Sequence, residues 1–351
     1  MAMAMAQVGP RAPLPLPAAA GARGARLLRA RGGMRRSVCS SSASSASSAS
    51  TREKPAVVIV PGFLADCGSY AALAQGLRDA GYAYTQVVPM RWFNWLPCVG
   101  GRSVRPVLDR IEHAVLSVSA AASEGEGATV EAAAELPLVA ARGVGYAVED
   151  FVAEMLDASK GAQPGVLAAA RAMAAGSASR RPVALIGHSA GGWIARIYLG
   201  DRAAYCGEVY GGGGGRVDRL CTLGTPHVSE DRIAAKTLGF VATHYPDVAS
   251  LKGLRRAVAV GGTGTLGDPK GVAGRLPDFT YQSYELCCGD GAADGDGVTP
   301  LSCSHALPGA ETLELDGIQH GPQPDTKGLW YGSADALPLW IQALELPSEA
   351  V

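Results

Sequence analysis

The stretch PVALIGHSAGGWIARIYLG, residues 182–200, decides the fold of this chain. Its first part, PVALIG, is a short apolar run of the kind that forms a strand buried on both faces. Its last part, WIARIYLG, favours a helix, so the chain must turn from strand to helix within HSAGG. Glycines flank this turn because larger side chains would clash there, and Ser189 is held beyond the carboxyl end of the strand. The stretch predicts an α/β fold that presents a serine at a strand-to-helix turn.

Similar runs on both sides of this stretch predict the rest of the sheet. AVVIV, residues 56–60, is stopped by Pro61 and Gly62 and forms the first strand. The predicted strands are residues 56–60, 84–88, 182–187, 216–227, 281–286 and 311–316. The predicted helices are residues 66–80, 107–118, 148–156 and 193–200. This alternation predicts a mostly parallel, doubly wound sheet with helices on both faces.

Three segments depart from the alternation, and we expect them to be insertions in a domain that spans residues 53–346. Residues 89–105 carry two Trp, one Phe and two Pro, which indicates either a loop that flanks a pocket or a surface loop anchored by its aromatics. Residues 119–143 are rich in Ala, Gly and Glu and form an expanded connection. Residues 228–275 have weak helical character and many Gly, which suits a lid-like segment over a site.

The amino-terminal residues 1–52 differ in composition from the rest of the chain. They contain eight Arg, no acidic residue, and the run SSSASSASSAS at residues 40–50. Such segments are typical of organelle transit peptides, and the richness in Ser and Ala favours a chloroplast, at the stroma or the thylakoid surface, over a mitochondrion. A low-complexity tail without an address is the alternative. We expect this segment to lie outside the fold.

Composition excludes several other classes of protein. No stretch of roughly 18 uncharged apolar residues predicts a membrane span, although peripheral contact with a membrane stays open. The chain after residue 52 holds all 32 acidic residues and is net negative, which argues against nucleic acid as a partner. The eight Cys are irregularly spaced and are expected to be free thiols. Cys287, Cys288 and Cys303 suit redox control or a buried structural role, and no spacing resembles a zinc site.

A serine nucleophile needs a base, and the base needs an acid that orients it. In this kind of fold the acid follows the penultimate strand and the base follows the last. His320 lies just after the strand predicted at 311–316, and Asp296 lies in the loop after 281–286, which it shares with Asp290 and Asp294. We therefore expect Ser189, Asp296 and His320 to act together. An ordinary loop histidine is the alternative for His320.

The remaining histidines and the first strand complete the expected site. His188, His227 and His305 fit the base position less well and are expected to pack or to line the pocket. An oxyanion hole takes one backbone N–H from the residue after the nucleophile, Ala190, and another from the loop after an early strand. Phe63 is placed for the second donor, and a plain strand-ending turn is the alternative.

Four blocks of the sequence, VIVPGF, GHSAGGW, LGTPH and GDGVTP, resemble the lipase and esterase branch of the α/β hydrolases, especially its plastid-targeted plant and algal members. The resemblance runs from about Pro55 to Pro322. It implies hydrolysis of carboxylic esters, often of lipids, without a metal or other cofactor. It also implies the catalytic triad Ser189, Asp296 and His320 and the oxyanion residue Phe63.

The sequence departs from that branch at two places. Pro61 stands where many relatives have His, which leaves the backbone donor of Phe63 intact. The interval from Gly62 to Ser189 is unusually long.

The expected activity is hydrolysis of a carboxylic ester through an acyl-enzyme on Ser189. Apolar and aromatic residues in 89–99 and the segment 228–275 favour a lipid or another hydrophobic ester as substrate. A thioesterase or amidase would use the same three residues, and a hydrolase-derived receptor would use the fold to bind a small ligand. A scaffold without activity would typically have lost one of the three residues, and this sequence keeps them all.

Overall fold

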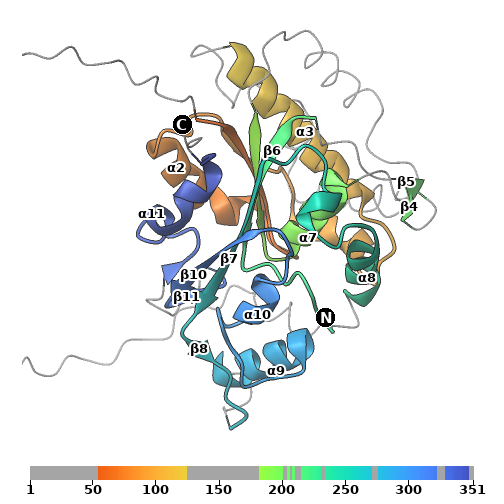
Figure 1. Cartoon of the computed structure of the whole chain (residues 1–351), viewed down its shortest axis with the longest axis vertical. Helices are drawn as coiled ribbons and strands as arrows, with labels where there is room; N and C mark the ends of the chain where they lie inside the picture. The colour runs from red at the N-terminus through yellow and green to blue at the C-terminus, as the bar shows by residue number, and fades with distance from the viewer. Residues whose placement is uncertain are drawn as a thin grey trace, which may run out of the picture. The chain divides into compact units, whose positions relative to one another are not determined.

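Six parallel strands form the central sheet of the described part of the chain (Figure 1). The structure is a computed structural model, and it describes residues 54–124, 182–200, 204–205, 208–209, 215–230, 234–270, 276–321 and 329–347. The strands are β1 (Ala56–Val60), β2 (Thr85–Val87), β3 (Val183–His188), β6 (Val217–Leu223), β7 (Arg256–Thr263) and β10 (Glu311–Asp316). Their order is β10-β7-β6-β3-β1-β2, so the predicted parallel sheet is confirmed.

The sheet is wound in two directions from its middle. The chain runs from β1 outward to β2, where Val57 aligns with Thr85, and then returns to β3 on the other side of β1, where Val58 aligns with Leu185. From β3 the strands continue outward as β6, β7 and β10. The direction of winding therefore reverses between β1 and β3, and ligands of open α/β sheets bind beyond the carboxyl ends of the strands at such a point.

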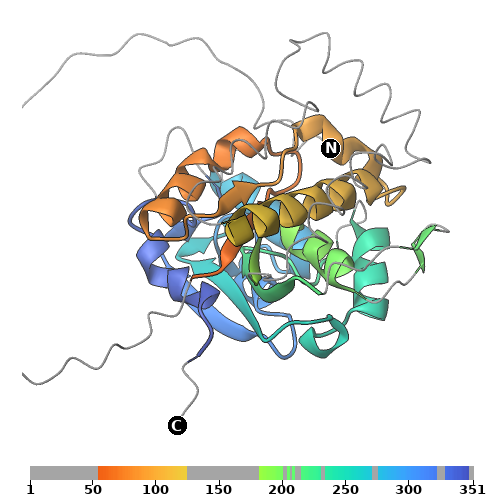
Figure 2. The same cartoon turned by 90° about the horizontal axis from the view of Figure 1, so that it is seen from above.

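Helices cover both faces of the sheet because successive strand residues point to opposite sides. Val58 and Val60 belong to the apolar cluster that includes α3 (Arg105–Glu124) and α7 (Ala190–Leu199). Val57 and Ile59 belong to the cluster that includes α2 (Ala71–Asp79) and α11 (Leu337–Trp340). Figure 1 shows α2 and α11 on one side of the sheet and α3, α7 and α8 (Ala235–His244) on the other, and Figure 2 shows the same layers from above.

Further elements, most of them short, connect the main ones. The helical elements are η1 (Cys67–Tyr70), η2 (Trp92–Cys98), η3 (Val248–Ser250), α9 (Leu276–Cys288), α10 (Leu301–Ser304) and η4 (Ile341–Leu344). The short strands are β4 (Ala204–Tyr205), β5 (Glu208–Val209), β8 (Thr265–Leu266), β9 (Asp294–Gly295), β11 (Ile318–Gln319) and β12 (Leu329–Trp330). The predicted helices at 66–80, 107–118 and 193–200 are confirmed by η1 with α2, by α3 and by α7.

The prediction of a strand at 281–286 is wrong, because these residues lie within the helix α9. Thr280, Ser283 and Tyr284 are buried there, whereas Gln282 and Glu285 are exposed. This spacing of three and four residues is that of a helix with one face on the core. The aromatic and alternating character of YQSYEL favoured a strand locally, and packing of this one face overrides it.

The prediction of a single insertion over 228–275 is also wrong, because the core strand β7 lies within it. Seven of its eight residues are buried, from Ala257 to Thr263. Gly261 and Gly262 hid the strand in the sequence, since glycine is depleted in strands. Here a side chain at Gly262 would collide with the carbonyl of Ile318 and lie 3.0 Å from the Cβ of Asp296, so the small residue lets loops approach the strand end.

Some sequence predictions fall outside the described residues. These are the transit peptide at 1–52, the helix at 148–156 and the part of the connection 119–143 beyond residue 124, up to which α3 continues. The described residues include no helix that is long and apolar enough to cross a membrane.

Helix α7 packs on the sheet at a distance that only glycine allows. A Cβ on Gly191 would lie 2.5 Å from the carbonyl oxygen of Val60 and 2.6 Å from that of Pro61. A Cβ on Gly187, at the end of β3, would lie 2.5 Å from the Cα of Gly192. The first turn of α7 therefore rests directly on the backbone of β1.

Two glycine-to-alanine changes in helices are expected to have opposite effects on the free energy of unfolding. Gly191→Ala should destabilise the protein by about 1–3 kcal/mol, because the new methyl group collides with backbone that has no room to move. Gly239→Ala in α8 should stabilise it by about 0.5–1 kcal/mol, because nothing lies within 4 Å of that position and alanine favours the helix. Urea unfolding measures both. A stabilised Gly191→Ala variant would contradict the close packing of α7 on β1.

Candidate active site

Ser189 lies in a strained turn between β3 and α7. Its backbone has φ 52° and ψ −128°, in the left-handed region of φ that residues other than glycine rarely adopt. The turn is held from the neighbouring strand, since the Ser189 N–H donates to the carbonyl of Leu223 at 2.9 Å. Within the described part of the chain, the Ser189 side chain makes no capping hydrogen bond to α7. The hydroxyl is therefore not used to stabilise its own helix.

A second strained turn faces the first from the end of β1. The Ala65 N–H donates to the carbonyl of Gly62 at 3.1 Å and closes a tight turn in which Leu64 has φ 58°. Ser189 and Leu64 are the two residues other than glycine with positive φ among those that the structure describes. A Cβ on Gly62 would lie 3.0 Å from the Cβ of Ser189, so the two turns are in contact. Both lie where the sheet reverses its direction of winding.

Asp296 and His320 form a hydrogen-bonded pair. The distance between His320 Nδ1 and Asp296 Oδ2 is 2.8 Å, and the backbone N–H of His320 donates to the carbonyl of Asp296 at 2.9 Å. Because Nδ1 is committed to the carboxylate, Nε2 is the ring nitrogen that can accept a proton from a nucleophile. The other acids of this loop lie elsewhere: Asp294 accepts from the N–H of Gly264, and Asp290 accepts from that of Ala292.

The carboxylate of Asp296 is buried and fully supplied with donors. Oδ1 accepts from the N–H groups of Val298 at 3.0 Å and Thr299 at 2.7 Å. Oδ2 accepts from His320 and from the hydroxyl of Tyr331, the latter at 2.8 Å. Burial by itself raises the pKa of Asp296, but the interaction with His320 and the two backbone donors outweigh it, and the net pKa is lowered. Asp296 is therefore ionised at neutral pH.

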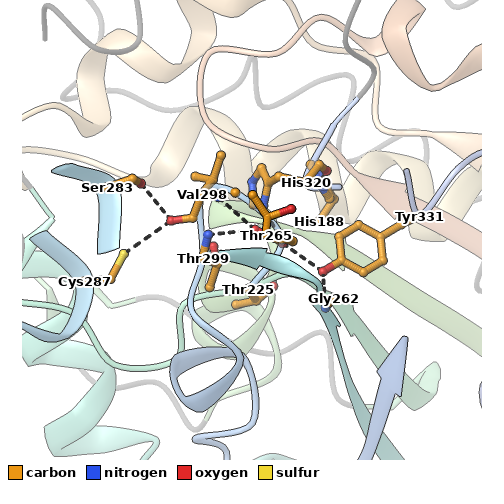
Figure 3. Close-up of polar contacts among 12 residues, drawn as sticks. His188, Thr225, Gly262, Thr265, Ser283, Cys287, Val298, Thr299, His320 and Tyr331 are labelled. Atoms are coloured by element: carbon orange, nitrogen blue, oxygen red, sulfur yellow. Dashed lines mark hydrogen bonds and ion pairs between the residues drawn. The ribbon is translucent and has the colours of Figure 1, made fainter. Parts of the chain in front are cut away.

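Tyr331 is a site residue that no sequence pattern predicts. Its hydroxyl accepts from the N–H of Gly262 at 2.8 Å (Figure 3). The same hydroxyl donates to Asp296. It thereby joins the end of β7 to the acid loop, although 35 residues separate it from Asp296 along the chain. No local motif marks such a contact, because it depends on how β12 returns to the sheet edge.

Helix α9 supports the acid loop from the other side. The Ser283 hydroxyl donates to the carbonyl of Val298 at 2.7 Å, and the Gly297 N–H donates to the hydroxyl of Tyr284 at 2.7 Å. Figure 3 shows Ser283 and Cys287 on the side of Val298 opposite to Tyr331. Residues 281–286, which were predicted as a strand and lie in α9, thus hold the turn that supplies backbone donors to Asp296.

The expected oxyanion residues lie beside Ser189. Ala190 is the first residue of α7 and is buried. Phe63 is half-buried in the turn after β1, and its ring packs edge-on against Trp95 with 5.7 Å between the centroids. Trp95 is fully buried within η2, so the segment 89–105 is anchored by its aromatics next to this turn.

The other expected residues pack inside the protein. His188 is buried with both ring nitrogens hydrogen-bonded. His227 contacts the hydroxyl of Thr222 at 3.0 Å, and His305 contacts the carbonyl of Leu313 at 3.3 Å. Among the described residues no cluster of His, Cys, Asp or Glu could hold a metal ion. None of the six described cysteines forms a disulfide.

The thiols of Cys287 and Cys303 are poor nucleophiles because burial raises the pKa of each to about 12.

A small cavity adjoins His320 on the side of the acid loop. Its wall is partly apolar and is formed by Thr265, Phe279, Asp296, Gly297, Val298, Gln319 and His320. The arrangement brings a strained serine, a histidine paired with an ionised buried carboxylate, and a partly apolar cavity to one edge of the sheet. Groups of these kinds can perform nucleophilic substitution at an acyl carbon.

The doubly wound parallel sheet, with a serine elbow after β3 and an Asp–His pair beyond β7 and β10, has the architecture of the α/β-hydrolase fold.

No protein-family model and no curated protein matches the chain. Among solved structures the chain is similar to a Bacillus licheniformis lipase, described as the crystal structure of lipase BlEst2 in mature form. The two share 13% sequence identity, with 84% of this chain and 93% of that chain covered and a TM-score of 0.39. Because this likeness is weak, the fold is assigned from the sheet and the turns of the chain itself.

Asp296→Asn is expected to lose stability in a way that depends on pH. Folding lowers the pKa of Asp296, so its charge contributes stability that is present above the ordinary value of 3.8 and is lost as the pH falls through the folded value. Relative to the wild type, the variant should lose about 1.5–3 kcal/mol at neutral pH, where charged hydrogen bonds are removed. This difference should shrink as the pH falls below 3.8.

Urea unfolding followed by circular dichroism at several pH values measures this difference. Asp294→Asn is the matched control and should cost less at neutral pH, because Asp294 is exposed. A difference for Asp296→Asn that stayed constant into the acid range would show that the charge of Asp296 is not what the fold stabilises.

Proposed function

We propose that this protein is a serine hydrolase that cleaves carboxylic esters through an acyl-enzyme on Ser189. The observation that carries the proposal is the strained Ser189 at the same sheet edge as the His320–Asp296 pair, in which the carboxylate is buried and ionised. A strained backbone is maintained only where the surrounding structure enforces it, and such sites are commonly functional. A buried carboxylate that orients an imidazole serves the chemistry of a general base.

In the proposed reaction the Ser189 oxygen attacks the acyl carbon while Nε2 of His320 takes the hydroxyl proton. Asp296 stays ionised, holds the imidazole by Nδ1 and stabilises the imidazolium that forms. His320 then gives the proton to the leaving alcohol, and the acyl group remains on Ser189. Water attacks this ester with His320 again as base, which releases the carboxylic acid and restores the serine.

The backbone N–H groups of Phe63 and Ala190 are proposed to bind the oxyanion. The contact of Gly62 with Ser189 supports this role for the turn after β1, since the backbone of that turn lies next to the nucleophile. The position of Ala190 at the amino terminus of α7 supports its role, because unpaired N–H groups and the helix dipole favour negative charge there.

A lipid or another hydrophobic ester is the proposed substrate class. Phe279 and Val298 form an apolar part of the wall of the small cavity, and Phe63, in the turn after β1, packs against Trp95. Trp92, Val228 and Leu266 are exposed on segments that follow the carboxyl ends of β2, β6 and β7. Apolar surface at this edge suits an acyl chain, and it also permits peripheral contact with a membrane.

Ser189→Ala is expected to abolish both ester hydrolysis and labelling by a fluorophosphonate, because one hydroxyl carries the nucleophilic step. The expected loss in kcat is on the order of 10⁴-fold or more. p-Nitrophenyl esters of increasing chain length report hydrolysis, and matched thioesters and amides of the same acyl group separate the possible activities.

Asp296→Asn and Asp294→Asn form the matched pair for the acid. The first should cost about 10⁴-fold in kcat, because an amide holds His320 in the wrong tautomer. The second should retain activity, since Asp294 makes its hydrogen bond to Gly264 and not to His320. Labelling that survives in Ser189→Ala, or equal losses in both amide variants, would overturn the assignment.

Residues 1–52 are proposed to be a transit peptide that directs the enzyme to the plastid, at the stroma or the thylakoid surface. Their composition supports an address, and the start of β1 at Ala56 supports a folded domain that begins close to residue 53. Residues 1–52 fused to a fluorescent protein should enter plastids of a plant cell. A chain that begins at Thr51 should fold and keep esterase activity. Cytosolic fluorescence would refute the address without affecting the assignment of the three catalytic residues.

A further inference from the structure

Consecutive hydrogen bonds through Tyr70 and His188 join the two loops that flank Ser189. The N–H of Gly62, in the turn after β1, lies 2.8 Å from the hydroxyl oxygen of Tyr70. That oxygen lies 2.6 Å from Nδ1 of His188. Nε2 of His188 lies 2.7 Å from the carbonyl oxygen of His320. One end of this chain of contacts is the proposed oxyanion turn, and the other is the loop of the proposed base.

The chemistry of the end groups fixes the direction of every bond. A carbonyl oxygen can only accept, so Nε2 of His188 carries the proton. Burial lowers the pKa of His188 to about 3, which keeps the ring neutral and leaves Nδ1 as an acceptor. Tyr70 must then donate to Nδ1, and its oxygen accepts from Gly62. Burial raises the pKa of Tyr70 well above its ordinary value, so its hydroxyl keeps the proton that it donates.

Aromatic packing shields this chain of hydrogen bonds from water. Trp330 packs edge-on against Tyr70 and against His188, with 5.9 Å between the ring centroids in each case. The rings of His188 and His320 lie 4.8 Å apart. Hydrogen bonds in such an environment are stronger than in water, and a broken one leaves buried groups without partners. The geometry is therefore well defined and costly to disturb.

We propose that Tyr70 and His188 are positioning residues, which hold the oxyanion turn and the base loop in register on either side of Ser189. This inference rests on the proposed hydrolysis and adds two residues to its machinery. The turn after β1 contains the strained Leu64, and the bond from Gly62 to Tyr70 helps to keep that turn in place. The carbonyl of His320 is held by His188, while its N–H and its ring are held by Asp296.

Three substitutions separate the two halves of this arrangement. Tyr70→Phe removes the link to Gly62. His188→Gln keeps a donor near the position of Nε2 and loses the acceptor for Tyr70, whereas His188→Asn keeps an acceptor near the position of Nδ1 and loses the donor to His320. Tyr82→Phe is the matched control, because Tyr82 is also buried but its hydroxyl bonds to Glu345.

The expected results are a fall in kcat of about tenfold to 10²-fold with little change in KM, the range that misplacement of reacting groups by up to about 1 Å produces. Affinity for a trifluoromethyl ketone, which forms a tetrahedral adduct with a serine, should fall in parallel in Tyr70→Phe and His188→Gln. The double variant Tyr70→Phe/His188→Gln should lose no more than Tyr70→Phe alone, because Tyr70→Phe already removes the bond between Tyr70 and His188. In Tyr70→Phe/His188→Asn the losses of the two single variants should add, because His188→Asn breaks the separate bond to His320. Tyr82→Phe should keep the wild-type kcat.

Two kinetic outcomes would overturn the proposal: an unchanged kcat in Tyr70→Phe, or additive losses in Tyr70→Phe/His188→Gln. Nitrogen NMR of the His188 ring reports the hydrogen bonds independently of activity. It should show a protonated Nε2 and an unprotonated Nδ1, and the chemical shift of Nδ1 should change in Tyr70→Phe. A wild-type chain with these NMR signals but without ester hydrolysis would refute the proposed function and leave the hydrogen bonds in place. A protonated Nδ1 would refute the arrangement itself.

Discussion

The buried carboxylate of Asp296 is the constraint on which the rest of the site depends. A charge without partners inside a protein is too costly to keep, so the fold must bring donors to it. Those donors come from the Asp296 loop itself, from His320 after β11, and from Tyr331 after β12. Each one draws its own segment to the edge of the sheet. Satisfying one charge thus fixes the loops that surround the proposed base.

Close backbone packing at the other side of the site has a similar effect. Gly191 lets α7 rest on the carbonyl of Val60, and Gly62 lets the turn after β1 touch Ser189. Ser189 and Leu64 have strained φ values in these two turns, and such strain persists only where the surrounding structure enforces it. Tyr70 and His188 connect this packed side to the loop of His320. The charge of Asp296 and the packing of the glycines therefore support the same site from opposite sides.

Local patterns predicted most of the sheet, but they missed the strand β7 and predicted a strand where the helix α9 lies. AVVIV and PVALIG predicted β1 and β3, since continuous apolar runs are typical of strands covered on both faces. The run AVAV within β7 has the same character, but the glycines after it concealed the strand. YQSYEL has the residues of a strand and forms a helix because only its face with Ser283 and Tyr284 packs on the core. Local preference is a weak guide when packing against distant segments decides which face is buried.

The sequence by itself determined the elbow at Ser189, because the glycines, the strand before them and the helix after them are consecutive residues whose conformations depend on near neighbours. It also placed Asp296 and His320 in loops at the correct edge, since parallel strands bring all their carboxyl ends together. Only the tertiary structure decided that Asp296, and not Asp290 or Asp294, contacts His320. The tertiary structure also brings Tyr331, Tyr70 and the ring of His188 to the site, through contacts that the sequence did not predict. Such contacts join residues far apart in the chain, and they form because buried polar groups must find partners wherever folding brings them together.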